Sequence, residues 1–150
     1  MDFQDTLGPW MGKTMKLMDI YFHDYFKQNN IDISKKQWII LKVLSDEDGR
    51  VQNDLAFVTN RDKTSLTRLL SGMEKKNLVA RIPSKLDKRI NHIHLTKNGN
   101  LLYQKTKPII QQLLNNIQEP LTETEIRDTI RVMQKLKEHL ITKIDSCDSN

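Results

Sequence analysis

The sequence is poor in cysteine and aromatic residues and has no long hydrophobic run. Cys147 is the only cysteine among 150 residues, so the chain can form no internal disulfide and no cysteine cluster for zinc. No stretch is long and apolar enough to span a membrane. The N-terminal residues Met1 to Asp5 lack the basic and then apolar profile of a secretion signal. These absences predict a cytoplasmic protein that is not held in a membrane.

Motifs of catalysis and metal binding are also missing. The sequence contains no glycine-rich phosphate loop, no Ser-His-Asp grouping and no paired carboxylates of an acid–base pair, so we expect neither an enzyme nor a cofactor. His92 and His94 share one strand face, but no third ligand lies close in sequence, and we expect no metal site. Cys147 lies in a polar tail, residues 145–150, where nothing basic or helical is expected to activate the thiol.

Positive charge is concentrated in the middle of the chain. The formal net charge is +5, but residues 61–97 alone hold ten Lys or Arg against three acids, a local charge of +7. A basic centre between near-neutral flanks is typical of a phosphate-binding surface. A soluble, lysine-coated surface is the alternative that charge alone leaves open.

Hydrophobic periodicity predicts six helical segments and one β-hairpin, a mainly α fold with a small β wing. Ser34 and Gln37 form one capping box, and Thr122 and Glu125 form a second, each marking a helix start. The expected helices begin near Pro9, Ser34, Asp54, Asp62, Thr96 and Thr122, and the hairpin pairs residues 79–83 with 90–95.

A short helix, a second helix and a basic hairpin together span roughly residues 51–96. In a helix-turn-helix the second helix enters the major groove, and a following hairpin reaches a neighbouring groove. Helical geometry places Leu66, Leu69, Leu70 and Met73 on an inner face of the second helix. Its outer face carries Thr64, Arg68, Ser71 and Lys75, flanked by Ser65 and Thr67, and contains no acid. Arginine, serine and threonine are residues that read bases and phosphates.

The tip of the hairpin contains Lys85, Lys88 and Arg89, interrupted by Asp87. Asp87 can orient Arg89 for a narrow minor groove by a charge-assisted hydrogen bond. Asp87 can also simply favour the turn.

These residues resemble the multiple antibiotic resistance regulator (MarR) family. Asp87-Lys88-Arg89 followed by Leu95-Thr96-Lys97-Asn98-Gly99 is similar to that family's signature, and Leu55-Ala56, residues 62–70 and residues 74–76 resemble its helix-turn-helix. Asn77 stands where the family usually has glycine, and Val51 where it often has threonine. The resemblance implies a winged-helix dimer that binds a pseudo-palindromic operator and is released by a small, often aromatic, acid. It implies that the DNA-binding residues are Lys63, Thr64, Ser65, Thr67, Arg68, Lys85, Lys88 and Arg89, with Asp87 orienting the wing.

The first and last helices have apolar stripes wider than one small core can cover. We therefore expect residues 1–30 and 97–145 to form a homodimer, with residues 34–96 as the DNA-binding lobe of a single domain, residues 1–150. The expected dimer contacts are Phe3, Leu7, Trp10, Ile126, Ile130, Met133, Leu136 and Leu140. Trp38 is expected in the core. The sequence does not identify effector-binding residues. A winged helix that binds another protein instead of DNA is the alternative function.

Overall fold

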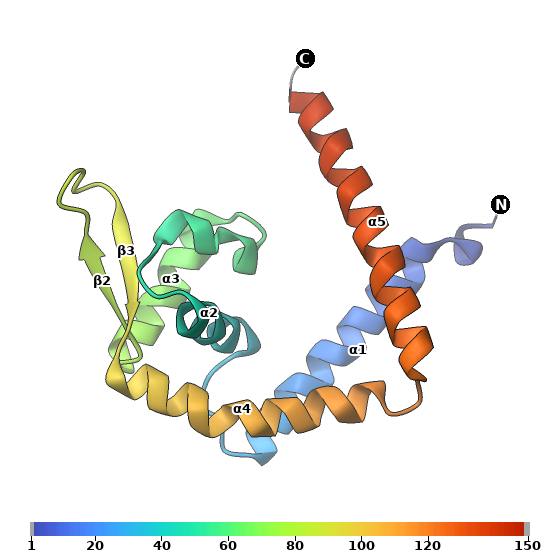
Figure 1. Ribbon diagram of the computed structural model, residues 1–150, viewed down its shortest axis with the longest axis horizontal. Coiled ribbons are helices and arrows are strands. Elements are labelled where there is room, and N and C mark those ends of the chain that lie inside the picture. Colours follow the sequence, from blue (N-terminus) through green and yellow to red (C-terminus); the bar gives the residue numbers. More distant parts are fainter. Residues whose placement is uncertain (1, 149–150) are drawn as a thin grey trace. The chain divides into compact units, whose positions relative to one another are not determined.

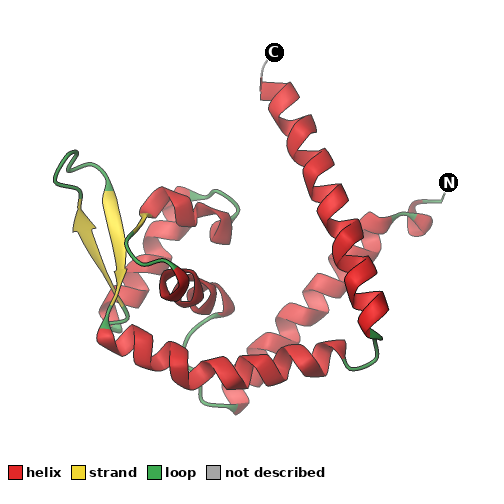
Figure 2. Cartoon of the chain, viewed as in Figure 1, coloured by secondary structure: helices red, strands yellow, loops and turns green. Residues whose placement is uncertain are grey.

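The computed structural model describes residues 2–148, which form helices and one small sheet (Figure 1 and Figure 2). The elements are η1 (Phe3–Asp5), α1 (Leu7–Gln28), α2 (Lys35–Asp46), β1 (Arg50–Val51), η2 (Gln52–Thr59), α3 (Lys63–Lys75), β2 (Val79–Pro83), β3 (Asn91–Leu95), α4 (Lys97–Gln118) and α5 (Glu123–Asp148). This order confirms the predicted mainly α fold with a β wing. Within the described residues, no helix is long and apolar enough to cross a membrane.

The chain divides into two compact units. The first runs to Leu113 and contains the sheet, the helices η1 to α3 and most of α4. The second begins at Leu114 and contains the end of α4 and the whole of α5.

Side-chain caps set the starts of two helices as the sequence predicts. The Ser34 hydroxyl accepts the N–H of Gln37 at 3.1 Å, and the Gln37 amide oxygen accepts the N–H of Ser34 at 3.1 Å. Thr122 and Glu125 form the same reciprocal pair, at 3.2 and 2.8 Å. Both pairs satisfy backbone N–H groups that a helix start leaves without partners.

The sheet has the antiparallel order β1-β3-β2. The hairpin of β2 and β3 has the predicted range, with Val79 opposite Leu95 and Pro83 opposite Asn91. The strand β1 was not predicted, because two residues are too few to show an alternating pattern. Arg50 of β1 pairs with Ile93, which ties the chain after α2 to the base of the wing.

The core of the first unit fixes α3 by its inner face. The core side chains with almost no exposure are Ile40, Leu41, Leu44, Leu55, Leu66, Leu70, Met73, Ile93, Ile110 and Leu113. The Trp38 indole N–H donates to the Thr106 hydroxyl at 2.9 Å, and its ring lies 5.7 Å from the Tyr103 ring. Trp38 therefore joins α2 to α4, but it is half-buried at the edge of the core and not one of the buried core residues.

Two local predictions need correction. The short segment predicted as a helix near Asp54 is a 3₁₀ helix, η2, and its first flanking residue, Val51, provides no side-chain cap. The expected polar tail is helical as far as Asp148, so Cys147 is an exposed residue of α5; Ser149 and Asn150 lie outside the described residues. The sequence pattern missed this turn because the apolar periodicity that predicts a helix stops at Ile144, whereas α5 continues to Asp148.

Candidate nucleic-acid interface

The helix α3 begins at a strong cap. The Asp62 carboxylate accepts the backbone N–H groups of Thr64 and Ser65 at 3.0 and 3.1 Å, and the Ser65 hydroxyl donates to it at 2.7 Å. These bonds to Ser65, with the Thr64 N–H and the charge of Arg68, lower the pKa of Asp62 below its ordinary value. The first turn of α3 is therefore held in a defined position.

The outward face of α3 presents most of the predicted DNA-binding residues. Leu66, Leu70 and Met73 are buried beneath it, so the opposite face is turned to solvent. The exposed residues of this outward face are Lys63, Thr64, Ser65, Thr67, Arg68 and Lys75. Within the described part of the chain, no hydrogen bond or ion pair holds Arg68. Its guanidinium can therefore meet an external ligand without first breaking a pair.

Ser71 is not part of that face, contrary to the sequence prediction. It is half-buried, and its hydroxyl accepts a hydrogen bond from Arg81 of β2 at 3.0 Å. Arg81 also pairs with Glu74 of α3. The strand β2 thus packs along the last turns of α3, so Ser71 contacts this strand while Lys75 beyond it stays exposed.

The wing ends in a fixed cationic turn. The Asp87 carboxylate accepts the Nε and Nη2 groups of Arg89, both at 3.1 Å, and the Arg89 backbone N–H at 3.0 Å. These bonds lower the pKa of Asp87 below its ordinary value, the side-chain bond most. The Arg89 side chain is nevertheless 91% exposed, and Lys85 and Lys88 are exposed beside it. Asp87 thus both closes the turn through the Arg89 backbone N–H and pairs with the Arg89 guanidinium, so the structure contains the contacts of both alternatives.

The Leu95–Gly99 motif joins the base of the wing to the start of α4. Thr96 donates its N–H to the Leu78 carbonyl at 3.1 Å and its hydroxyl to the Asn77 carbonyl at 2.6 Å. The same hydroxyl accepts the Gly99 N–H at 3.0 Å and so caps α4. A Cβ at Gly99 would lie 2.1 Å from the Leu78 carbonyl oxygen, which explains the glycine. Asn77 closes α3 with a left-handed φ of 54°, as predicted.

Both wing histidines bind the turn after α2. His92 Nδ1 lies 2.9 Å from the Gly49 carbonyl oxygen, and His94 Nδ1 lies 3.0 Å from the Asp48 carboxylate. Asp48 also accepts the Leu95 N–H at 2.6 Å. Residues 2–148 bring together no group of three His, Cys, Asp or Glu side chains that could hold a metal ion. The histidines therefore hold the wing base in this structure.

The residues predicted to form dimer contacts leave much apolar surface uncovered in the single chain. Phe3, Leu7 and Trp10 are 71, 54 and 61% exposed, and Ile130 and Leu140 of α5 are 51 and 49% exposed. The half-buried members of the set are Ile126, Met133 and Leu136.

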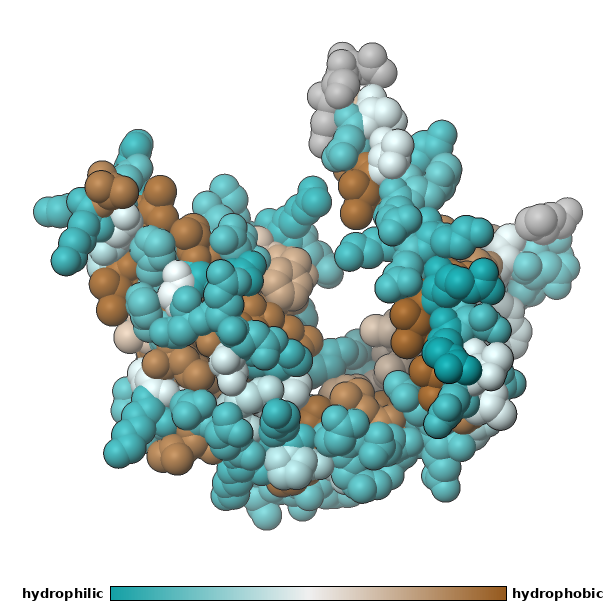
Figure 3. Space-filling view, viewed as in Figure 1, coloured by the Kyte–Doolittle hydropathy of each residue, from teal (hydrophilic) through white to brown (hydrophobic). Residues whose placement is uncertain are grey.

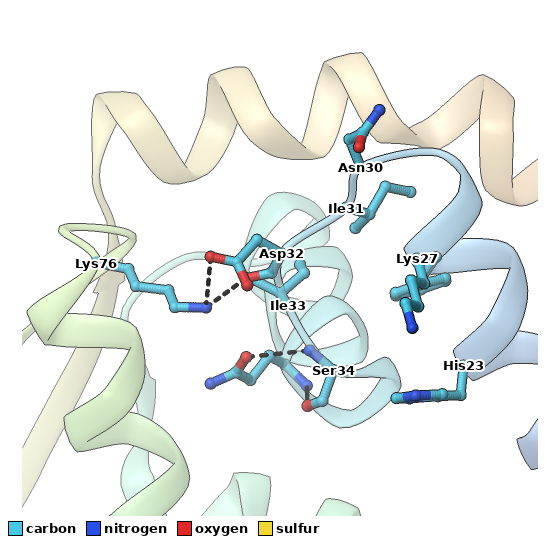
Figure 4. A pocket seen from close by; sticks show the side chains of 10 residues that line it. His23, Lys27, Asn30, Ile31, Asp32, Ile33, Ser34 and Lys76 are labelled. Carbon is cyan, nitrogen blue, oxygen red and sulfur yellow. Dashed lines mark hydrogen bonds and ion pairs between the residues drawn. The ribbon is translucent and has the colours of Figure 1, made fainter.

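An open cavity of about 550 Å³ lies where α1, the linker to α2 and the end of α3 meet (Figure 4). Its apolar wall is Phe26, Ile31 and Ile33, and its polar wall includes His23, Lys27 and Lys76. The Lys76 ammonium binds the Asp32 carbonyl oxygen and lies 3.4 Å from its carboxylate. The sequence prediction named no such residues, although the four-residue spacing of His23 and Lys27 places both on one helix face.

Comparison with known proteins shows similarity to the MarR family over the middle of the chain. The profile described as MarR family matches residues 31–90, the segment that contains α2, α3 and the wing turn. Over this segment the chain is similar to the MarR family. A relative from Escherichia coli, the homoprotocatechuate degradative operon repressor, is 28% identical over 115 residues, which are 77% of this chain and 76% of the relative.

Solved MarR-family structures share the fold. The Staphylococcus aureus MepR–DNA complex aligns with a TM-score of 0.78 and 24% identity, covering 89% of this chain and 98% of that one. Bordetella bronchiseptica BpsR, described with regulation of its DNA binding by 6-hydroxynicotinic acid, aligns with a TM-score of 0.81 and 17% identity, covering 91% of this chain and 96% of that one. The predicted winged helix-turn-helix is thereby confirmed.

Proposed function

We propose that this protein is a transcription regulator that binds double-stranded DNA as a homodimer. We further propose that it acts as a repressor, because its E. coli relative is described as an operon repressor. The observation that carries the proposal is the pair of basic surfaces on the first unit: the outward face of α3 and the wing tip with Arg89 held by Asp87. A face built to bind an apolar protein partner would present aromatic residues, whereas α3 presents hydroxyls and cations.

In the proposed complex α3 occupies the major groove. Arg68 can bridge the O6 and N7 acceptors of guanine, and the Thr64 hydroxyl can bond a base edge or a phosphate. The hydroxyls of Ser65 and Thr67 donate to the Asp62 carboxylate and the Lys63 carbonyl, so they can accept a hydrogen bond from a base amino group. Lys63, in the first turn, is placed to meet a phosphate. The cap at Asp62 supports this role because it fixes the first turn before DNA arrives.

The wing then reaches the adjacent minor groove. A narrow minor groove has an enhanced negative potential that attracts an inserted arginine. Arg89 is already held by Asp87, so little side-chain entropy remains to be lost on insertion. Lys85 and Lys88 would contact the phosphates on either side.

Dimerisation is proposed for residues 1–30 and 97–145, and DNA binding for residues 34–96. The exposed apolar residues named above, from Phe3 to Leu140, would be buried between two chains, at about 25 cal/mol per Å² of apolar area removed from water. Two-fold symmetry then predicts a pseudo-palindromic operator with half-sites about one helical turn apart. Since DNA is the proposed partner, the cytoplasm is the compartment in which we propose that it acts.

A small organic acid is proposed as the effector, and the cavity beside Lys76 as its site. The cavity volume of about 550 Å³ falls in the usual range for small ligands. A ligand carboxylate would compete with Asp32 for the Lys76 ammonium, and Lys76 directly follows α3. Release of DNA requires that the ligand prefer a protein form whose α3 helices do not fit the operator.

Selection of bound fragments from random DNA tests the proposed function. The wild type should recover a palindrome, and Arg68→Ala should bind it about 1–3 kcal/mol more weakly with one base preference relaxed. Lys36→Ala on α2 removes an equally charged, exposed side chain named in neither the DNA nor the dimer contacts and should bind as the wild type does. Wild-type affinity for both Arg68→Ala and Arg89→Ala would refute the proposed docking.

The effector site has its own test. Titration of the DNA complex with 6-hydroxynicotinate and homoprotocatechuate should release DNA with at least one of these aromatic acids, and Lys27→Ala should require more of it. Unchanged DNA affinity across a wider panel of aromatic acids would refute an organic acid as effector.

A further inference from the structure

The wing tip presents one apolar side chain entirely to solvent. Leu86 is 100% exposed, and the nearby Ile82 and Ile90 are 50 and 39% exposed. Figure 3 shows apolar atoms at the free end of the wing, surrounded by hydrophilic ones. Turns usually place glycine, asparagine, aspartate or serine at such positions. Leu86 therefore contributes nothing to the core, and folding does not explain it.

The turn holds this leucine in a defined place. The Ser84 hydroxyl accepts the Leu86 N–H at 3.2 Å, and the Ser84 N–H donates to the Ile90 carbonyl at 2.7 Å. The Ile90 N–H donates to the Asp87 carbonyl at 3.0 Å, and the Arg89 N–H donates to the Asp87 carboxylate at 3.0 Å. Four interactions thus fix the backbone on both sides of Leu86. An apolar group presented by a rigid turn loses little entropy when it is buried against a partner.

The charges around Leu86 favour nucleic acid as that partner. Lys85, Lys88 and Arg89 lie within three residues of it, and cations at this density attract phosphates. The phosphates of a duplex border the minor groove, into which minor-groove proteins insert leucine, isoleucine or proline between base steps. An apolar protein groove would require a larger patch without charge at its centre. A single leucine is also too small to hold the wing on a lipid surface.

We propose that Leu86 is an apolar wedge that enters the minor groove beside Arg89 and makes the wing select flexible base steps. The inference rests on the proposed DNA binding and adds a specificity-determining residue to it. Pyrimidine–purine steps such as TA unstack most readily, so the wing should favour them without any hydrogen bond to a base. A duplex with a stiff AA step at the wing position should bind more weakly.

Two variants separate a wedge from a charge contact. The probe is the duplex that the wild type selects from random DNA, with a copy in which the wing-contacted step is changed from TA to AA. Leu86→Ala should bind the TA duplex roughly a hundredfold more weakly, about tenfold for the loss of most of one buried leucine at each of the two wings, with the same salt dependence as the wild type. Lys88→Ala should instead reduce the salt slope by about 2, since each of the two wings loses one phosphate contact.

A matched control and a structural readout complete the test. Phe57→Ala removes another exposed apolar side chain, 56% exposed on η2 and named in neither the DNA nor the dimer contacts, and should bind as the wild type does. Permanganate should oxidise the thymine of the wing-contacted step in the wild-type complex and spare it with Leu86→Ala. Equal affinity, or equal preference for TA over AA, in Leu86→Ala and the wild type would overturn the wedge while the proposed function stands. A wild type that selects no duplex would overturn the proposed function itself.

Discussion

Replacement of Gly99 by alanine should destabilise the protein strongly although it adds only one methyl group. The new Cβ would lie 2.1 Å from the Leu78 carbonyl oxygen and 2.9 Å from Leu95 Cδ1. Because real Cβ contacts essentially never fall below 3.0 Å, the start of α4 and the Leu78 carbonyl oxygen must separate by about 0.9 Å, from 2.1 to 3.0 Å. That separation strains the Thr96 N–H bond to Leu78, which joins the wing base to α4.

The magnitude follows from three opposing contributions. Overpacking costs about 1–3 kcal/mol, and the weakened hydrogen bond costs about 1 kcal/mol more. Alanine regains about 1 kcal/mol over glycine inside a helix. The net loss is about 2 kcal/mol, a large share of the roughly 5–15 kcal/mol that keeps a domain folded.

Urea unfolding at one fixed chain concentration measures this loss. With a slope of about 2 kcal/mol per molar urea, the midpoint should fall by about 1 M. Gly72→Ala is the matched control, because its Cβ would meet only the Gln37 amide nitrogen at 3.4 Å, an ordinary van der Waals contact, and it should leave the midpoint unchanged or raise it slightly. If Gly99→Ala unfolds at the wild-type midpoint, the steric explanation of the glycine is wrong.

Three further predictions concern the cap, the wing and the core. Asp62→Ala should destabilise α3 at neutral pH. Because the pKa of folded Asp62 lies below the ordinary 3.8, the wild-type cap is lost only as the pH falls through that lowered value. Urea unfolding at a series of pH values should therefore show the free energies of unfolding of the wild type and the variant converging there. Asp87→Asn should weaken DNA binding by freeing Arg89, and an NMR titration should show wild-type Asp87 protonating only below 3.8; an unperturbed titration would count against the pair. Trp38→Phe should cost about 1 kcal/mol through the lost bond to buried Thr106, and an unchanged urea midpoint would contradict this.

Local signals in the sequence predict the helices well because caps are short-range. Ser34 with Gln37 and Thr122 with Glu125 are each three residues apart, and the structure forms both boxes. The strand β1 escaped prediction because its identity depends on pairing with Ile93, more than forty residues away in the chain. Ser71 was assigned to the outward face because helical geometry alone does not reveal that Arg81 reaches back to its hydroxyl.

The candidate site was predictable where it lies on one element and hidden where elements meet. The outward face of α3 follows from its helical period, and the Asp87–Arg89 pair follows from a two-residue spacing. The cavity joins α1, a linker and Lys76, so only the folded chain brings its walls together. Leu86 was visible in the sequence as an apolar residue among charges, but its complete exposure required the structure.

The central claim is that two copies of the chain place their α3 helices and wings on one duplex. Analytical ultracentrifugation of the protein mixed with its selected palindromic duplex, at low ionic strength, measures the composition of the complex directly. The account predicts two chains per duplex, and the same dimer without DNA. A monomer in solution that leaves every duplex free would contradict it.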